Sequence, residues 1–190
     1  CIYFGEGSIE EGVFHEAINF SAQKKLPILF ICENNYFSVY SPLKYRQPKN
    51  RNISKMIAAA GIESYKENGN DVEKIYSISK YSINKIRKKS NPIFLEFNTY
   101  RWREHCGPNY DNNLGYRKLN DFRLWLKKDP VKNFEKKLTK DFIINTKIKN
   151  QLLLSINKKI KSAFDFAEKS PYPKKYDACL LYTSQSPRDR

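Results

Sequence analysis

The sequence predicts an α/β fold built on a mostly parallel β-sheet. Three apolar runs support this prediction, IYF at residues 2–4, ILFIC at 28–32 and PIFLEF at 92–97. Continuous runs of this kind are typical of parallel strands that are covered on both faces. Between the first two runs, apolar residues recur at helical spacing, at Val13, Phe14, Ala17, Ile18 and Ala22. Strand, helix and strand in this order form a βαβ unit.

The first helix has recognisable signals at both ends. Ser8, followed three residues later by Glu11, matches a capping box, so we expect the helix to begin at about Ile9. Lys24 lies in its last turn, where a cation complements the helix dipole, and Pro27 stops it.

The rest of the chain alternates helices with loops. Residues 36–51, rich in Tyr, Pro and Arg, are expected to form a loop. A further long loop is expected at residues 101–117, which show no periodicity, and loops of this length are often functional. Helices are predicted over four segments, 52–62 with an end near Gly61, 69–89, 121–129 with a stop at Pro130, and 147–168 with one apolar and one lysine-rich face.

Composition narrows the function classes. The 190 residues are 40% hydrophobic, which indicates a globular protein, and no apolar run approaches the roughly 20 residues of a membrane span. The net charge of +15 keeps a nucleic-acid-binding protein as an alternative, but the lysines are spread along the chain rather than gathered in one patch. The four cysteines show no CxxC spacing, which argues against a disulfide framework or zinc site and favours a reducing, cytoplasmic location.

Both ends of the sequence suggest a fragment. Cys1 already lies inside an apolar run, so we expect the natural chain to begin upstream. The residues from Cys179 to Ser184 back-translate to the end of a common transposase-based sequencing adaptor, so residues 179–190 are interpreted as read-through. The expected organisation is therefore one incomplete domain at 1–170, a tail at 171–178 and the read-through segment.

Polar motifs follow the first two predicted strands. Gly5-Glu6-Gly7 ends the first strand and Asn34-Asn35 ends the second, and the carboxyl ends of parallel strands meet at one edge of a sheet, where ligands bind. Carboxylate and amide oxygens suit Mg²⁺, which completes its shell with phosphate oxygens and water. Glycine N–H groups and a helix N-terminus at the same place suit a diphosphate. Taken separately, each motif is also compatible with ordinary turn chemistry.

The two motifs together resemble the thiamine-diphosphate motif, with Glu6 and Asn35 separated by 29 residues. The flanking sequence EEGVFHEAINFSAQKKLPILFICENN is similar to the alpha subunit of the decarboxylating component of 2-oxo-acid dehydrogenase complexes. That family includes pyruvate, branched-chain and acetoin dehydrogenases. The similarity continues through AAAGI, GNDV, PIFLEFNTYR and GYR to about Pro130. It implies a three-layer thiamine-diphosphate-binding fold, truncated at its N-terminus, with a helical C-terminal part.

The resemblance also assigns roles to single residues. It implies that Mg²⁺ is bound by the Glu6 carboxylate, the Asn35 side-chain oxygen and the main-chain carbonyl of Phe37. Gly7 and Ser8 would offer backbone N–H groups to the diphosphate.

Two residues of the long loop complete this set. His105 corresponds to the histidine that lies over the cofactor and would be catalytic, and Arg101 matches the arginine four residues before it. The sequence departs from the family at Glu6, where Asp is commoner, and at Cys106, where a Ser is often phosphorylated.

The implied activity is oxidative decarboxylation of a 2-oxo acid, or acetoin cleavage, with acyl transfer to a lipoyl group. The implied partners are a beta subunit in an α₂β₂ assembly and the lipoyl acyltransferase component. An alternative within the same cofactor class is a ketol transfer of the transketolase type. The sequence does not identify the substrate.

Overall fold

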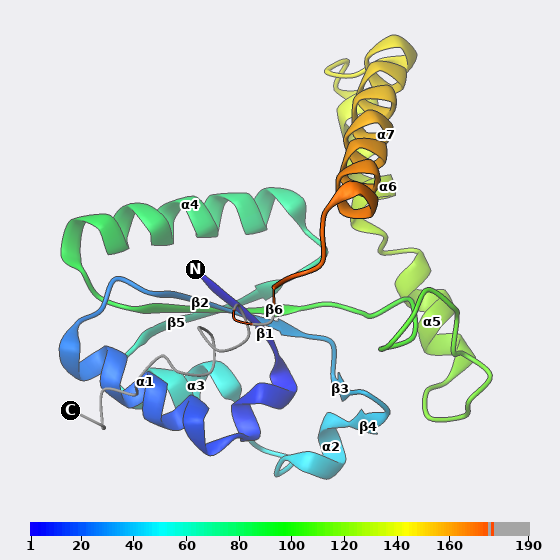
Figure 1. The fold of residues 1–190 in the computed structure, drawn as a ribbon. Helices are drawn as coiled ribbons and strands as arrows, with labels where there is room; N and C mark the ends of the chain where they lie inside the picture. Colours follow the sequence, from blue (N-terminus) through cyan, green and yellow to red (C-terminus); the bar gives the residue numbers. More distant parts are fainter. Residues whose placement is uncertain (175, 177–190) are drawn as a thin grey trace. The chain divides into compact units, whose positions relative to one another are not determined.

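The computed structural model describes residues 1–174 and 176, and Figure 1 shows their fold. The predicted read-through segment 179–190 lies outside the described residues. The chain divides into two compact units, Cys1–Lys136 and the part from Lys137 onward, and each is described by itself. The predicted domain limits therefore stay a prediction.

The first unit is built on a four-stranded parallel sheet. Its strands are β1 (Ile2–Gly5), β2 (Leu29–Asn34), β5 (Glu63–Asn68) and β6 (Ile93–Asn98), in the order β1-β2-β6-β5. Every neighbouring pair is parallel. The predicted α/β class with a mostly parallel sheet is confirmed.

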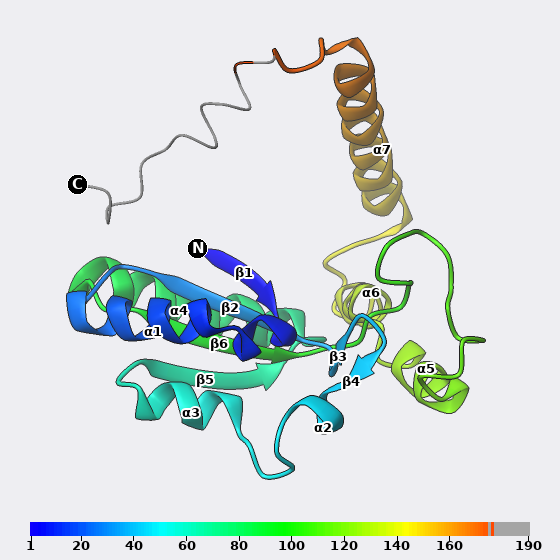
Figure 2. The same ribbon diagram turned by 60° about the horizontal axis from the view of Figure 1, so that its bottom comes forward.

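Helices cover both faces of this sheet, which gives three layers (Figures 1 and 2). Helices α1 (Gly12–Lys24) and α3 (Ile53–Ala59) lie on one face, and α4 (Val72–Lys89) lies on the other. Side chains alternate along β2, so Phe30 and Cys32 belong to the core cluster under α1 and α3, while Leu29 and Ile31 belong to the cluster under α4. This double coverage explains the continuous apolar run of β2.

Strand β1 is more exposed than its apolar sequence indicated. It pairs only with β2 and forms an edge of the sheet, and Tyr3 is 65% exposed. Phe4 packs against the core cluster, but Cys1 and Ile2 are exposed. The prediction of a strand covered on both faces is therefore wrong for β1, because only β2 pairs with it among the described residues and most of its side chains are exposed.

The capping box at Ser8 is also wrong. Residues Glu6–Glu10 form a short 3-10 helix, η1, and α1 begins only at Gly12. The carbonyl of Ser8 accepts a hydrogen bond from the Glu11 N–H, so Ser8 lies inside the preceding turn rather than at a cap. The buried face of α1 consists of Phe14, Ile18 and Ser21, whereas Val13 is 70% exposed.

Strand β5 was not predicted from the sequence. Its sequence, ESYKEN, has no apolar run, because β5 is the second edge of the sheet and most of its side chains are partly or fully exposed. Its backbone pairs with β6 from Glu63 to Asn68. Pairing with an established neighbour, rather than local hydrophobicity, therefore defines this strand.

The predicted loops and helices are confirmed in outline. Within 36–51 the chain forms a small hairpin, β3 (Phe37–Ser38) and β4 (Ser41–Pro42), followed by α2 (Leu43–Arg46). Residues 99–118 have no helix or strand, as predicted.

Helix α5 (Leu119–Leu126) follows this loop. Pro130 is the first residue of a further helix, α6 (Pro130–Lys140), which was not predicted, and the missing N–H of proline is tolerated at that position.

The second unit contains the predicted amphipathic helix as α7 (Thr146–Lys169). Asn145 caps its N-terminus, since its side-chain oxygen accepts a hydrogen bond from the Ile148 N–H. The apolar residues of this helix are exposed. Among the described residues of the whole chain, no helix is long and apolar enough to cross a membrane.

Candidate functional site

The acid of the GEG motif is a buried carboxylate. Glu6 is the first residue of η1, immediately after β1, and it is 1% exposed. Its Oε1 accepts a hydrogen bond from Nη2 of Arg46 at 2.5 Å. The same guanidinium donates to Glu10 Oε1 at 2.6 Å and to the Ser41 carbonyl at 3.2 Å. A buried carboxylate requires such a cation, because an isolated charge is strongly disfavoured in the interior.

Gly7 brings this acid against the segment that follows β2. A Cβ atom at Gly7 would lie 2.9 Å from Ser38 Oγ and 3.1 Å from Ser38 Cβ, closer than side-chain packing allows. A side chain at position 7 would require Ser38 to shift, so glycine favours the close approach of η1 to β3. The sequence predicted that the GEG and Asn-Asn segments meet at one edge of the sheet. In the structure, η1, which begins at Glu6, lies against β3, which follows the Asn-Asn pair.

The Asn-Asn pair forms two consecutive turns. Asn34 Oδ1 accepts a hydrogen bond from the Tyr36 N–H at 3.0 Å, and Asn35 Oδ1 accepts one from the Phe37 N–H at 3.1 Å. Asn34 is buried and Asn35 is partly exposed. An amide oxygen has two lone pairs, so Asn35 keeps one acceptor site for a ligand.

The long loop is anchored to the β3 hairpin through Arg101 and Tyr116. Arg101 Nη2 donates to the Val39 carbonyl at 2.8 Å and to the Tyr116 hydroxyl at 3.0 Å. The Tyr116 ring packs edge-on against Phe37 and Tyr40, with centroid distances of 5.5 and 5.1 Å. The sequence-predicted Arg101 therefore holds the two loops together.

A buried ion pair fixes the base of this loop. Asp111 accepts hydrogen bonds from the Arg117 guanidinium and, at 2.5 Å, from the Tyr116 hydroxyl. Burial by itself would raise the pKa of Asp111, but the Tyr116 hydrogen bond and the Arg117 charge outweigh it, so the pKa lies below its ordinary value. Asp111 is therefore a charged anchor.

His105 and Cys106 lie in the exposed part of the same loop. His105 makes no hydrogen bond or ion pair with another described residue, and no contact among these residues joins it to Glu6 or Asn35. Glu104 accepts hydrogen bonds from the N–H and the side-chain amide of Asn109. The structure thus orders the loop around His105 and leaves the imidazole itself accessible.

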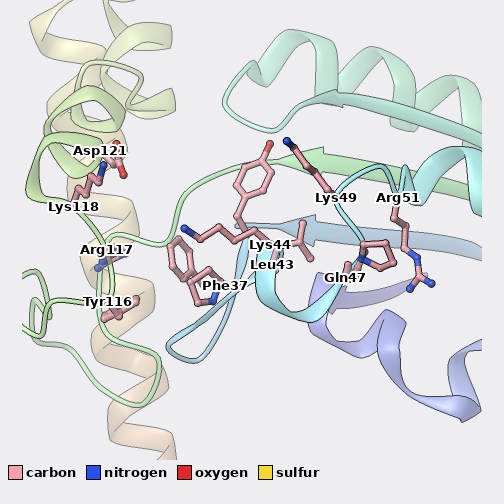
Figure 3. Close-up of a pocket in the computed structure, with 13 residues that line it drawn as sticks. Phe37, Leu43, Lys44, Gln47, Lys49, Arg51, Tyr116, Arg117, Lys118 and Asp121 are labelled. Atoms are coloured by element: carbon pink, nitrogen blue, oxygen red, sulfur yellow. The ribbon is translucent and has the colours of Figure 1, made fainter.

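A cavity of about 420 Å³ adjoins the Asn-Asn turn (Figure 3). Its lining comes from residues 36–51 and 116–121, with aromatic and apolar walls that include Tyr36, Phe37 and Leu43. Five cations and one carboxylate also line it, namely Lys44, Lys49, Arg51, Arg117, Lys118 and Asp121. The excess of positive charge suits an anionic ligand.

The fold defines the class of protein, an α/β protein with a mostly parallel sheet, and its candidate ligand site lies beyond the carboxyl ends of neighbouring strands. The family model "Dehydrogenase E1 component" matches residues 1–176. The chain therefore belongs to the dehydrogenase E1 component family, which confirms the resemblance found in the sequence.

Two curated relatives illustrate the similarity. The chain is 32% identical over 171 residues to the 2-oxoisovalerate dehydrogenase subunit alpha of Bacillus subtilis, covering 90% of this chain and 51% of the relative. It is 28% identical over 181 residues to the pyruvate dehydrogenase E1 component subunit alpha of Rickettsia bellii, covering 95% and 53%. The chain thus spans about half the length of these relatives.

Among solved structures, a transketolase from Campylobacter jejuni aligns with a TM-score of 0.42 and 24% identity, over 50% of this chain and 14% of that one.

Two charged residues of the site were not singled out from the sequence. Arg46 lies in the segment predicted as a loop, and nothing local marks it as the partner of Glu6. Glu96 is a fully buried acid in the middle of β6. Its position inside the apolar run PIFLEF was a usable signal, because an acid at a doubly covered strand position must have buried partners.

Gly7 gives a direct test of the close approach between η1 and β3. In the full-length chain, Gly7→Ala is expected to lower the free energy of unfolding by about 1–3 kcal/mol, because the new methyl group overlaps Ser38. Gly12→Ala is the matched control, since a Cβ there meets no atom within 4 Å. Denaturant unfolding of both variants checks the prediction, and equal stability would contradict the packing described for Gly7.

The Asp111–Arg117 pair predicts a pH dependence. The pKa of Asp111 is depressed in the folded state, so its stabilisation is present above the unfolded pKa of about 4 and is lost as the pH falls through the lower folded value. Asp111→Asn is expected to destabilise the protein by roughly 3 kcal/mol at pH 7, because it leaves a buried guanidinium unpaired.

The difference between the wild type and Asp111→Asn should shrink in acid below about pH 4. Unfolding midpoints at several pH values measure it, and Asp121→Asn is the control, since Asp121 forms no ion pair with a described residue. A constant difference across this range would show that the carboxylate charge is not responsible.

Proposed function

We propose that this chain is part of the alpha subunit of a thiamine-diphosphate- and Mg²⁺-dependent E1 component, which oxidatively decarboxylates a 2-oxo acid. One observation carries the proposal. Gly7 packs η1 against β3, so the Glu6 segment and the Asn35–Phe37 turn lie together at the carboxyl edge of the parallel sheet. Membership of the E1 family and similarity to two alpha subunits support the same assignment.

The donor set at this edge fits a magnesium diphosphate. Glu6, the Asn35 side chain and the Phe37 carbonyl supply three hard oxygen donors, the kind that Mg²⁺ prefers. The described contacts of Glu6 use Oε1 alone, so Oε2 is the oxygen proposed to bind the metal. Arg46 holds Oε1, so the metal proposed at Oε2 would share this carboxylate with the guanidinium.

The diphosphate is proposed to lie at the start of η1. The first N–H groups of a helix have no acceptor within the helix, which leaves those of Gly7 and Ser8 available to phosphate oxygens. The N-terminus of α1 at Gly12 is three residues further along than the predicted start at Ile9, so the backbone of η1 is proposed to take its place in this role.

Thiamine diphosphate bound here would supply the chemistry that breaks the bond between the carbonyl and carboxyl carbons of a 2-oxo acid. The chain's own residues would attract the substrate, position the His105 loop and transfer a proton. The cations of the cavity would raise the local concentration of an anionic substrate, and Arg101 would hold the His105 loop against β3. The exposed His105 imidazole would hold or move a proton at the reacting centre.

A partner subunit follows from the same proposal. The E1 alpha subunit would pair with a beta subunit in an α₂β₂ assembly and pass its acyl group to the lipoyl acyltransferase component. Large apolar side chains exposed on β1 and α1, among them Tyr3, Val13 and Phe20, offer a surface for such contacts. Cys1, Cys32 and Cys106 are free thiols, in accord with the cytoplasmic location proposed for the enzyme.

The activity is tested on the full-length protein, co-produced with its beta subunit. Reduction of an artificial electron acceptor is followed with pyruvate, branched-chain 2-oxo acids and acetoin, each with and without thiamine diphosphate and Mg²⁺. Turnover that requires both cofactors is expected, and the best substrate names the enzyme. Cofactor binding without turnover of any of these substrates would instead favour another thiamine reaction, such as ketol transfer.

The metal site has its own test. Glu6→Ala is expected to abolish Mg²⁺-dependent binding of thiamine diphosphate in the assembled enzyme, because the buried carboxylate is the only charged donor proposed for the metal. Glu11→Ala is the matched control, since the Glu11 side chain makes no cap hydrogen bond at the nearby start of α1. Calorimetric titration measures both affinities, and an unchanged affinity in Glu6→Ala would remove Glu6 from the site.

A further inference from the structure

Glu96 is a carboxylate buried beneath the proposed metal loop. It lies in β6, is 0% exposed, and accepts three hydrogen bonds from three different elements. Asn34 Nδ2 of β2 donates to Oε1 at 2.9 Å, and Lys66 Nζ of β5 donates to the same oxygen at 2.9 Å. Ser54 Oγ of α3 donates to Oε2 at 2.8 Å. Both oxygens therefore accept hydrogen bonds, two at Oε1 and one at Oε2.

Stability alone does not account for this arrangement. Removing a carboxylate from water is costly, and well-packed apolar residues in place of a buried ion pair are often neutral or stabilising. The other side chains of β6 from Ile93 to Phe97 are apolar and buried. An acid at this one position therefore indicates a role in fixing the geometry of its neighbours.

The neighbour that Glu96 fixes is the amide of Asn34. Because Nδ2 donates to Glu96, Oδ1 is directed to the other side, where it accepts the hydrogen bond from the Tyr36 N–H. A flipped amide would place Oδ1 against the carboxylate and present a donor to another donor. The charge of Glu96 thus selects one of the two amide orientations.

The orientation of the Asn34 amide determines whether the Tyr36 N–H has an acceptor. Tyr36 has φ 67°, in the left-handed region that a non-glycine residue rarely adopts. The hydrogen bond that the Tyr36 N–H donates to Asn34 Oδ1 holds this strained turn in place. This turn sets the direction of the Asn35 side chain and of the Phe37 carbonyl. The next residue in the chain is Ser38, which lies against Gly7.

We propose that Glu96 is a positioning residue that acts through Asn34 and Tyr36 to hold the Asn35–Phe37 turn in its ligand-binding conformation. The geometry of the turn is a property of this chain alone. Its consequence for the metal rests on the proposed function, and the experiment separates the two.

The first measurement is amide hydrogen exchange in the full-length, metal-free protein. Glu96→Gln keeps the size of the side chain but allows the Asn34 amide to turn, so the segment 34–38 is expected to exchange about tenfold faster. Glu63→Gln is the matched control, because Glu63 is paired with Lys85 and Tyr65 and does not contact Asn34. The control should leave this segment unchanged.

The second measurement is the Mg²⁺ concentration that gives half-maximal binding of thiamine diphosphate. This concentration is expected to rise by about tenfold in Glu96→Gln, because the loss of a residue that orients a metal ligand weakens metal binding by at least about this factor. It should stay unchanged in Glu63→Gln.

Combining Glu96→Gln with Tyr36→Gly distinguishes a positioning role of Glu96 from a general loss of stability. Tyr36→Gly accepts the left-handed conformation without strain, so the turn no longer depends on Asn34. In that background Glu96→Gln should change exchange and Mg²⁺ dependence by less than about twofold. An equal effect in both backgrounds would mean that Glu96 acts only through the stability of the core, and would overturn the proposal.

Two further outcomes are decisive. If Glu96→Gln does not fold, Ser54→Ala removes one hydrogen bond to Glu96 and should still accelerate exchange at 34–38, whereas unchanged exchange overturns the proposal. If exchange responds as expected but the wild-type protein binds no thiamine diphosphate, the proposed function fails and the positioning role of Glu96 stands.

Discussion

The charge balance of two buried carboxylates organises this end of the molecule. Glu6 in η1 and Glu96 in β6 are both buried, where an uncompensated charge is strongly disfavoured, and each is matched by a basic residue from a distant segment. Arg46 binds Glu6 and thereby fixes α2 beside η1. Lys66 binds Glu96 and thereby ties the polar edge strand β5 to β6. The loops that form the candidate site are thus placed by electrostatics as much as by apolar packing.

The Glu6–Arg46 pair also bears on how a metal would bind. Arg46 uses all three of its nitrogens, on Glu6, Glu10 and the Ser41 carbonyl, so its guanidinium is held in place from three sides. A metal at the second oxygen of Glu6 would therefore bind beside a fixed positive charge, which disfavours a second cation unless phosphate oxygens neutralise it. This arrangement couples metal binding to diphosphate binding, which is what a magnesium diphosphate ligand requires.

Much of the fold follows from local pattern, and much of the site does not. The runs at β2 and β6 are continuous because helices cover both faces, and the motif at Glu6 and Asn35 follows from strands ending at one edge. Strand β5 and the start of α1 escaped prediction because pairing with β6 and the turn of η1 override local signals. The ion pair between Arg46 and Glu6 joins residues 40 positions apart, and the hydrogen bond from Ser54 to Glu96 joins residues 42 positions apart, so no local pattern encodes either contact.

The loop that carries His105 shows a division between rigid and accessible parts. Its base is fixed by Asp111 and Arg117 and by Tyr116 against β3, whereas His105 is exposed and has no partner among the described residues. An imidazole in this position has the ordinary freedom of a surface residue, and proton transfer requires a defined geometry. The anchored base brings the backbone of the loop to the site, so a bound ligand or partner subunit needs to order only its tip. On the proposed function, assembly would therefore complete the catalytic arrangement that this chain begins.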